Sequence, residues 1–243
     1  MLNPITAQKL EQLGLKGMLR ALQQTNATEA KKLSFDERFG MLVDIELSDR
    51  DTRRVERLLR SAKLRHASAS LEEVNYTAGR NLDHATLMSL ASCQWIQQRQ
   101  AVILCGATGV GKSWLACALG KQACRNGFST YYVTATQLFE DIRTALAAGT
   151  INKLKRSLSK TELLIIDDLG IGGIDVSLGP SLLEIIDLQS SVGALLVASQ
   201  FPVESWYDLF NDSTVADAVL DRIVHRAHKI NLAGESQRKK LLA

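Results

Sequence analysis

The chain has 243 residues, 46% apolar and 23% charged, which is the balance of an ordinary soluble globular protein. No apolar stretch is long enough to span a membrane and the N-terminus lacks the segments of a secretion signal, so membrane and secreted classes are excluded and a cytoplasmic protein is expected. The net charge is only +3, but residues 1–68 carry 13 basic and 9 acidic side chains while residues 69–243 carry 16 and 17, so the positive excess lies in the N-terminal part.

The N-terminal part is predicted to be helical. Apolar residues recur at roughly helical spacing over residues 6–24, interrupted by two glycines, which indicates one or two short helices. Ser34 and Glu37 fit a capping box, in which each side chain accepts an N–H group of the first turn. A long helix is therefore expected to begin at Ser34, and no proline or glycine stops it between residues 41 and 66.

The second half of this long helix concentrates positive charge. Only Asp51 and Glu56 offset seven basic side chains, of which six are arginine, whose planar donor fork suits phosphate groups. A charged helix face is as often a solvated surface as a binding site, and no aromatic residue is present here for base stacking. We therefore expect contacts with the backbone of double-stranded DNA. The expected DNA-binding residues are Arg50, Arg53, Arg54, Arg57, Arg60, Lys63 and Arg65.

A short, small and polar stretch at residues 67–81 is interpreted as the linker into a second domain. The predicted domains are residues 1–68, a helical region for DNA binding and oligomerisation, and residues 69–243. The second domain is expected to begin with a helix over residues 82–98.

Residues 101–113 carry the strongest pattern in the chain. An apolar run predicts a buried strand, and it breaks at Gly106 into a turn that fits the pattern G-x-x-x-x-G-K-[ST]. In such a loop successive N–H groups point at a polyphosphate, Lys112 reaches the β- and γ-phosphates, and Ser113 binds Mg²⁺. A purely steric glycine turn is the weaker alternative because a strand and a helix flank it. The expected ATP-binding residues are Gly106, Ala107, Thr108, Gly109, Val110, Gly111, Lys112, Ser113 and Trp114.

Two further expectations concern the surroundings of this loop. A segment just before a phosphate-loop domain often closes over the adenine base, so Tyr76 or Arg80 is a candidate contact, and packing of Tyr76 within the linker is the alternative. The four cysteines form no C-x-x-C pair and the four histidines are scattered, so buried free thiols are expected rather than disulfides or a zinc site.

Beyond the loop, strands are predicted over residues 129–134 and 163–170, a helix over residues 137–148, and a short basic helix or loop over residues 151–160. The second of these strands ends in Asp167 and Asp168. Because ligands of open α/β sheets bind at the carboxyl ends of strands, Asp167 is expected to hold Mg²⁺ and Asp168 to orient the attacking water. Capping of a following helix is the weaker alternative.

The last elements supply further candidates. A strand over residues 194–198 is followed by Gln200, which is expected to reach between the γ-phosphate and the water, with Ser199 as the second choice. Residues 214–226 are expected to form a helix and residues 228–232 a closing strand. This last segment contains three arginines, Arg222, Arg226 and Arg238. The sequence patterns by themselves are equally consistent with exposed surface cations at all three positions.

Together these stretches resemble a known family. Residues 106–113, 163–170, 199–202, 216–228 and 234–238 are similar to the IstB-like transposition helper ATPases, in the AAA+ branch that also holds the DnaC and DnaI helicase loaders. The resemblance covers nearly the whole chain, including residues 15–18 and 34–38. The runs over residues 216–228 and 234–238 favour the IstB-like proteins over the loaders.

The resemblance implies an α/β fold, a P-loop AAA+ ATPase core with a parallel sheet flanked by helices, plus a small N-terminal helical domain and no C-terminal lid domain. It also implies ATP-dependent self-assembly on DNA, in which Arg222 is the arginine finger given to the neighbouring subunit and Arg238 is the sensor within the subunit. Two positions depart from general AAA+ enzymes. Asp168 stands where glutamate is usual, and Gln200 stands where asparagine or threonine is usual.

The expected function is ATP hydrolysis with Mg²⁺, coupled to assembly of a homo-oligomer on duplex DNA. The resemblance implies that this assembly helps a cognate transposase select target DNA. No D-D-E constellation is found in the chain itself, so strand transfer is expected to belong to that partner. A helicase loader would share the same ATP site. A small P-loop kinase would need an acceptor pocket, and a non-hydrolysing architectural DNA-binding protein remains open because of the short second acid.

Overall fold

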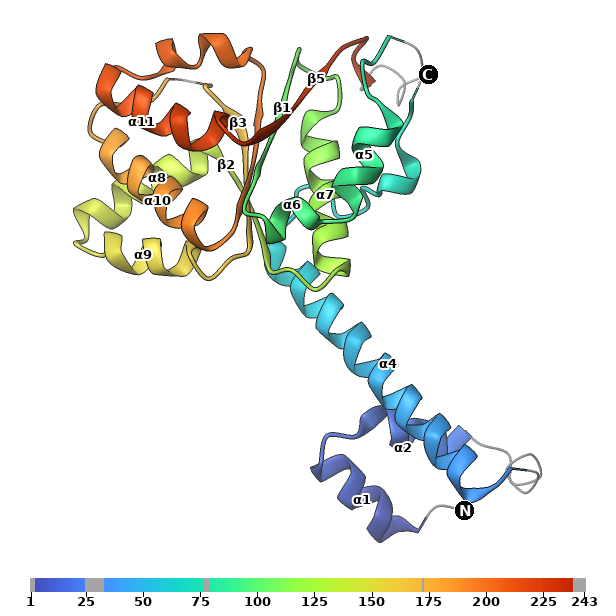
Figure 1. Cartoon of the computed structure of the whole chain (residues 1–243). Coiled ribbons are helices and arrows are strands. Elements are labelled where there is room, and N and C mark those ends of the chain that lie inside the picture. The colour runs from blue at the N-terminus through green and yellow to red at the C-terminus, as the bar shows by residue number, and fades with distance from the viewer. Residues whose placement is uncertain (1–2, 25–32, 77–78, 172, 238–243) are drawn as a thin grey trace. The chain divides into compact units, whose positions relative to one another are not determined.

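The computed structural model describes residues 3–24, 33–76, 79–171 and 173–237, and the chain forms two compact units, Met1–Arg57 and Leu58–Ala243 (Figure 1). The division lies within helix α4 (Phe35–Ala62), upstream of the boundary predicted after residue 68. The reason is packing, since Ala62 and Ala69 are fully buried and Ala69 belongs to a core of the second unit.

The N-terminal unit consists of the short helices α1 (Pro4–Gln12) and α2 (Lys16–Gln24) and most of α4. The side chain of Asn3 caps α1, and the predicted pair of short helices is thereby confirmed. The capping box is also confirmed. The N–H of Ser34 donates to Glu37 Oε2 at 2.7 Å, and the N–H of Glu37 donates to Ser34 Oγ at 3.2 Å.

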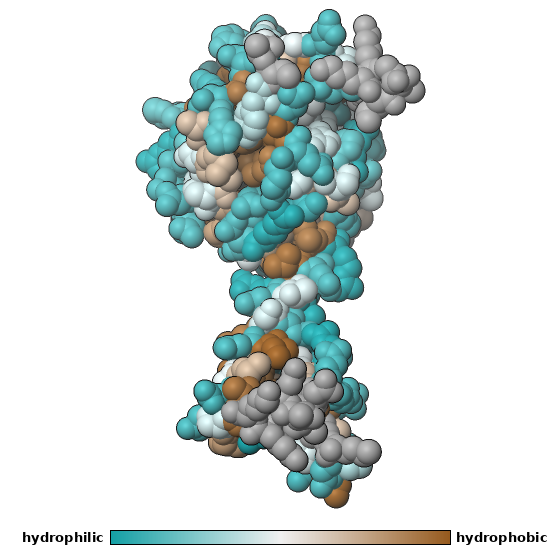
Figure 2. Space-filling model, turned by 90° about the vertical axis from the view of Figure 1, so that its right-hand side faces the viewer, coloured by the Kyte–Doolittle hydropathy of each residue, from teal (hydrophilic) through white to brown (hydrophobic). Residues whose placement is uncertain are grey.

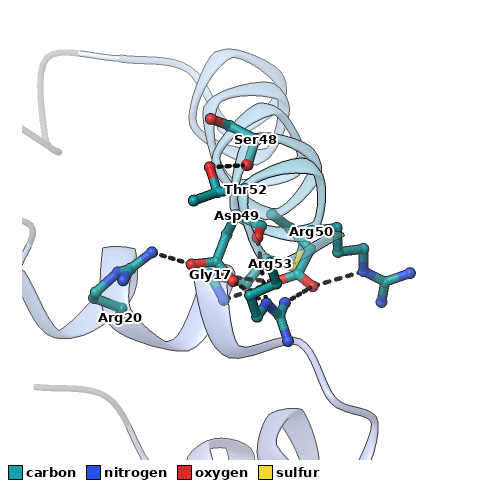
Figure 3. A network of polar contacts seen from close by, with 9 residues as sticks. Gly17, Arg20, Ser48, Asp49, Arg50, Thr52 and Arg53 are labelled. Atoms are coloured by element: carbon teal, nitrogen blue, oxygen red, sulfur yellow. Dashed lines mark hydrogen bonds and ion pairs between the residues drawn. The ribbon is translucent and has the colours of Figure 1, made fainter. Parts of the chain in front are cut away.

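A buried glutamate, Glu46, contacts Gly17, Arg50 and Arg53, which are labelled in the polar network of Figure 3. Glu46 is 4% exposed, and its Oε2 accepts the N–H groups of Gly17 at 2.7 Å and Met18 at 3.1 Å, in the first turn of α2. Its Oε1 pairs with Arg50 Nε at 2.8 Å. Glu46 thus caps α2, which is distant from it in sequence. Its position along α4 coincides with the helical spacing of the apolar residues around it.

The N-terminal unit exposes several large apolar side chains. Only Gly17, Ala21 and Glu46 are buried among its described residues. Brown hydrophobic atoms are accordingly visible on this unit in Figure 2. The large apolar side chains exposed on α4 are Phe35, Phe39, Met41, Ile45 and Leu47.

The second unit is built on a five-stranded parallel sheet with the order β2-β3-β4-β1-β5 (Figure 1). Strand β4 lies between β1 and β3, so the loops that follow these three strands emerge side by side at one edge of the sheet. The strands are β1 (Ala101–Gly106), β2 (Thr130–Thr134), β3 (Leu163–Leu169), β4 (Ala194–Ser199) and β5 (Ala227–Leu232).

Helices cover both faces of this sheet because successive residues of each buried strand point to opposite faces. One core joins Val102, Leu104 and their neighbours to α5 (His84–Ala91), α6 (Gln94–Gln97) and α7 (Lys112–Arg125). The other joins Ile103, Ile166 and their neighbours to the opposite layer of helices. That layer consists of α8 (Ala135–Ala147), α9 (Ile151–Leu158), α10 (Gly179–Val192) and α11 (Ser213–Val224). Short 3-10 turns cover Leu71–Glu73, Val203–Ser205 and Tyr207–Leu209.

The predicted elements are present, with three differences. The expected helix over residues 82–98 is broken into α5 and α6 at Cys93, which has a left-handed backbone (φ 59°). Helix α4 ends at Ala62 because Lys63 takes a φ of 52°. Helix α10 lies in a stretch for which the sequence patterns give no prediction.

The four cysteines are free and buried, as expected. Burial raises the pKa of Cys93 and of Cys117 to about 11, so both remain protonated thiols at neutral pH. Among the described residues, no helix combines the length and apolar character that crossing a membrane requires.

Replacing Glu46 by glutamine should loosen α2. Burial opposes ionisation of Glu46, but hydrogen bonds from Arg50, Met18 and Gly17 outweigh it and lower the pKa below the usual 4.5. A lowered folded-state pKa stabilises the unit above pH 4.5, and this stabilisation is lost as the pH falls through the lowered value. We expect the Gly17 and Met18 amides to lose about 1–3 kcal/mol of protection in Glu46→Gln, measured by hydrogen exchange at neutral pH.

Asp44→Asn is the control, because this side chain is exposed on the same helix. The wild type and Asp44→Asn should lose protection of α2 on acidification, whereas Glu46→Gln should show a flatter pH dependence. Identical pH profiles in all three proteins would contradict the role given to Glu46.

Candidate nucleotide site

The glycine-rich loop between β1 and α7 has a backbone that only glycine tolerates at three positions. Gly106, Gly109 and Gly111 have φ values of 145°, 89° and 101°. A Cβ atom at Gly106 would lie 2.2 Å from the carbonyl oxygen of Leu232, and one at Gly109 would lie 2.3 Å from Ser236 Oγ. The glycines therefore permit both the turn and the close approach of two later segments.

The loop encloses a positive centre. Lys112 is 6% exposed, and its Nζ donates to the carbonyl oxygens of Gly106 at 2.7 Å and Ala107 at 2.9 Å. No side chain caps the N-terminus of α7, whose N-cap residue is Gly111, so the N–H groups of its first turn are suited to an anionic ligand. The loop thus combines an ammonium group, a helix N-terminus and curled backbone, the arrangement that binds polyphosphates.

A cavity of about 580 Å³ adjoins the loop and has the size of a small-molecule site. Gly106 and Ala107 contribute carbonyl groups to Lys112, and Val110 is buried in the core. The remaining six of the nine expected ATP-binding residues line the cavity, namely Thr108, Gly109, Gly111, Lys112, Ser113 and Trp114.

The two acids at the end of β3 differ in their surroundings. Asp167 is fully buried, and its Oδ2 accepts a hydrogen bond of 2.6 Å from the Tyr132 hydroxyl on the neighbouring strand β2. Its Oδ1 accepts the N–H of Asp168 at 2.9 Å. Burial, and then the bond to Asp167, raise the pKa of Tyr132, so this hydroxyl remains a donor. Asp167 is therefore held in one orientation, and it is buried beside Asp168 rather than among the residues that line the cavity.

Asp168 lies in the cavity itself, on strained backbone. Its φ of 58° is rare for a residue with a side chain, and the pairing of β3 with β4 shifts register between Ile166 and Leu169. Such a bulge aims a side chain away from the regular pleat. It places a carboxylate, one-third exposed, opposite the phosphate loop.

Magnesium prefers hard oxygen ligands, and the site offers them from two directions. Ser113 contributes a hydroxyl from the first turn of α7, and Asp167 contributes a carboxylate whose remaining lone pairs are unused by its two described hydrogen bonds. The chemistry of this donor set fits Mg²⁺.

Gln200 joins the two halves of the site. It follows β4 directly, and its Oε1 accepts a hydrogen bond of 3.0 Å from the Thr108 hydroxyl in the phosphate loop. Ser199, the second choice, has a different position. It is fully buried and donates to the carbonyl oxygen of Leu169 at 2.7 Å, which makes it a link between β4 and β3 rather than a group in the cavity.

The candidates for adenine contact also differ. Arg80 is buried beneath the loop, where it donates to the carbonyl oxygens of Val110 at 2.9 Å and Asn75 at 2.7 Å, and burial lowers its pKa. It lines the cavity, as does Asn75. The Tyr76 ring instead lies 5.0 Å from the ring of His84 and is absent from the lining.

Sequence reasoning missed the contact between the C-terminal segment and the phosphate loop. The N–H of Gln237 donates to the carbonyl oxygen of Gly109 at 2.9 Å, and Gln237 lines the cavity. The Gly-Glu-Ser-Gln run over residues 234–237 was the one sequence feature that pointed to this segment. Its distance in sequence from the loop does not predict that the two are in contact. Arg238, the expected sensor, lies outside the described residues.

Arg222 lies at the opposite end of the sheet. Its Nε pairs with Asp187, and its Nη1 donates to the carbonyl oxygen of Ala218 at 3.0 Å. With Ala101 and Leu195, near the starts of β1 and β4, it lines a second cavity of about 230 Å³. The length of β1 therefore separates it from the phosphate loop of its own chain.

The seven basic residues expected on one helix are divided. Arg50 and Arg53 pair with acids of their own helix, Glu46 and Asp49, which the sequence count of offsetting acids omitted. The exposed members within α4 are Arg50, Arg54, Arg57 and Arg60.

The other two members of the seven lie beyond the end of α4. Lys63 Nζ lies 5.4 Å from the centre of the Tyr131 ring. Arg65 lines the nucleotide cavity, where its Nη1 is 3.8 Å from Asp168 Oδ2. These positions correct the expectation that all seven cations lie on one helix, because Lys63 and Arg65 follow its end at Ala62.

The comparisons with known proteins agree with this geometry. The chain matches the family described as "IstB-like ATP binding protein" over residues 8–242. It is 40% identical over 235 residues to an insertion-sequence ATP-binding protein of Sinorhizobium fredii, covering 96% of each chain. It is 43% identical over 203 residues to the IS1162 ATP-binding protein of Pseudomonas fluorescens, covering 83% of this chain and 88% of that one.

Solved structures share the fold. The structure of DnaI superimposes with a TM-score of 0.57 at 20% identity, covering 73% of this chain and 94% of that one. The DnaC helicase loader gives 0.57 at 17% identity, covering 69% and 98%. The parallel sheet thus has the fold seen in DnaI and DnaC, and the chain belongs to the family of IstB-like ATP-binding proteins of insertion sequences.

Proposed function

We propose that this protein hydrolyses ATP when it assembles on duplex DNA, and that the assembly helps a transposase select its target. The observation that carries the proposal is the convergence of Lys112, Asp168 and Gln200 on one cavity, from the ends of three adjacent strands. A phosphate-binding loop alone would serve binding. The acid and the amide opposite it are the groups that hydrolysis requires in addition.

Each residue of the site has a role in this proposal. Lys112 and the N–H groups of the loop bind the β- and γ-phosphates, while Ser113 and Asp167 hold Mg²⁺, which neutralises phosphate charge. Asp168 orients the attacking water, and Gln200 fixes the position of the loop relative to the acids. Tyr132 keeps Asp167 in place through its 2.6 Å hydrogen bond.

The proposed arginine finger is Arg222, acting on the nucleotide of a neighbouring subunit. Strand β1 rises about 3.3 Å per residue, so about 16 Å lie between its start, near Arg222, and the loop at its end. An arginine side chain does not span this distance. Arg222 is thus placed to act on a second copy, and hydrolysis would depend on assembly. Arg238 remains the proposed sensor.

The proposed DNA contact lies on α4. Arg54 and Arg57 are exposed, whereas Arg53 belongs to the network around Glu46. An exposed arginine pair at i and i+3 on a helix is suited to two successive phosphate groups of a duplex. We therefore assign DNA binding to Arg54 and Arg57 first, with Arg50 and Arg60 beside them.

The transposition context comes from the relatives, which are named as insertion-sequence ATP-binding proteins and are 40% and 43% identical. The helicase loaders are below 25% identical and share the fold alone. The exposed apolar side chains on the N-terminal unit suit a protein contact, either with a transposase or with another subunit.

Lys112→Ala should abolish ATP binding, because the loop would lose the only ammonium group among the described lining residues of its cavity. Calorimetric titration with ATP measures this. Lys121→Ala, on the same helix α7 but bonded to the carbonyl of Ser68, is the matched control and should bind as the wild type does. Unchanged affinity in Lys112→Ala would contradict the assignment of the loop.

Arg222→Ala should bind ATP normally and lose hydrolysis by about 10³-fold or more, because a finger stabilises only the transition state. Asp168→Asn should also be inactive, and asparagine tolerates the left-handed backbone at this position. Mixing the two variants should restore part of the phosphate release, since some interfaces then combine an intact finger with an intact acid. A mixture that stays inactive would argue against action in trans.

Replacing both Arg54 and Arg57 by alanine should weaken binding to all duplex sequences alike. The slope of log affinity against log salt should flatten by about one unit for each lost phosphate contact. Fluorescence anisotropy at several salt concentrations measures the slope. A double variant of Arg125 and Arg143, which pair with exposed acids in the second unit, removes the same charge and should keep the wild-type slope.

A further inference from the structure

Arg65 occupies a place that its sequence context does not indicate. It lies three residues beyond the end of α4, in the second unit, and its side chain lines the nucleotide cavity together with Lys112 and Ser113. The side chain is 50% exposed. A strong cation other than Lys112 therefore lines the cavity beside Asp168.

The groups around this guanidinium are the acids of the site. Its Nη1 lies 3.8 Å from Asp168 Oδ2, which is too long for a hydrogen bond. A hydrogen bond with Tyr132, and then the negative charges of Asp167 and Asp168, raise the pKa of Arg65. Arg65 is thus held beside the acids by charge, while most of its five donors are not used by Asp168.

A triphosphate changes this balance. Its terminal phosphate carries more negative charge than one carboxylate, and it would enter the space between Lys112 and the acids. An exposed ion pair at 3.8 Å is weak, so the guanidinium loses little by turning from Asp168 to a phosphate, which it binds as a planar fork. A diphosphate lacks the terminal phosphate that would attract the Arg65 guanidinium away from Asp168.

We propose that Arg65 is a phosphate-binding residue that contacts the terminal phosphate of a nucleoside triphosphate within its own subunit, and that it returns to Asp168 when only a diphosphate is present. The inference rests on the proposed nucleotide site and adds a residue to it. It has two consequences. Arg65 distinguishes triphosphate from diphosphate, and its departure removes a cation from beside Asp168.

The test compares binding of ADP and of the β,γ-methylene analogue of ATP by calorimetry. Arg65→Ala should weaken binding of the analogue by about 10-fold or more, the loss of one charge-assisted hydrogen bond, and that of ADP by less than about 2-fold. Arg65→Lys should fall between Arg65→Ala and the wild type, because it keeps the charge without the fork. Arg125→Ala, whose partner Glu72 lies outside the cavity lining, is the control and should change neither affinity.

A second variant separates direct contact from an effect through Asp168. If Arg65 only shields the carboxylate, adding Asp168→Asn to Arg65→Ala should restore binding of the analogue, and this recovery would overturn the proposal. Equal weakening of both nucleotides in Arg65→Ala would overturn it too, because a structural role makes no distinction between them. Failure of the wild type to bind either nucleotide would instead overturn the proposed function.

Discussion

The parallel pairing of β4 with both β1 and β3 is the constraint on which the nucleotide site depends. Ser199, at the end of β4, is in register with Cys105 on β1 and with Leu169 on β3. The loops after these strands therefore begin at the same level of the sheet, and Gln200 reaches Thr108. Because β4 lies between the strands that carry the phosphate loop and the acids, the residue that follows it lies between these two groups.

Those parts of the site that depend on local patterns were predictable. The glycines of the loop have positive φ values that other residues rarely adopt, so three glycines within six residues indicate this backbone from the sequence alone. The acids follow an apolar strand, and parallel sheets bind ligands at that end. The same reasoning recovered the strands of the sheet. It gave no place for α10 and no end for α4, where the break at Lys63 has neither glycine nor proline.

Contacts between distant segments were not predictable. In sequence, Arg65 resembles the six cations before it, and only the fold brings it to Asp168. Glu46 occupies an apolar spacing along α4, yet it is buried as the cap of α2 and the partner of Arg50. Counting acids only within the basic segment therefore omitted Glu46 and Asp49, which pair with Arg50 and Arg53. The backbone strain at Asp168 is equally invisible in the sequence, because it arises from a register shift between two strands.

The hydrogen bond between Gln237 and Gly109 joins the glycine-rich loop to a segment that is synthesised much later. The loop leaves the ribosome long before β5 and the segment after it, which pack against Gly106 and Gly109. In a nascent chain, the glycine-rich loop therefore lacks its contacts with Leu232, Ser236 and Gln237, even after the strand and helix beside it have formed. The loop should therefore reach its final conformation only when translation has passed residue 237.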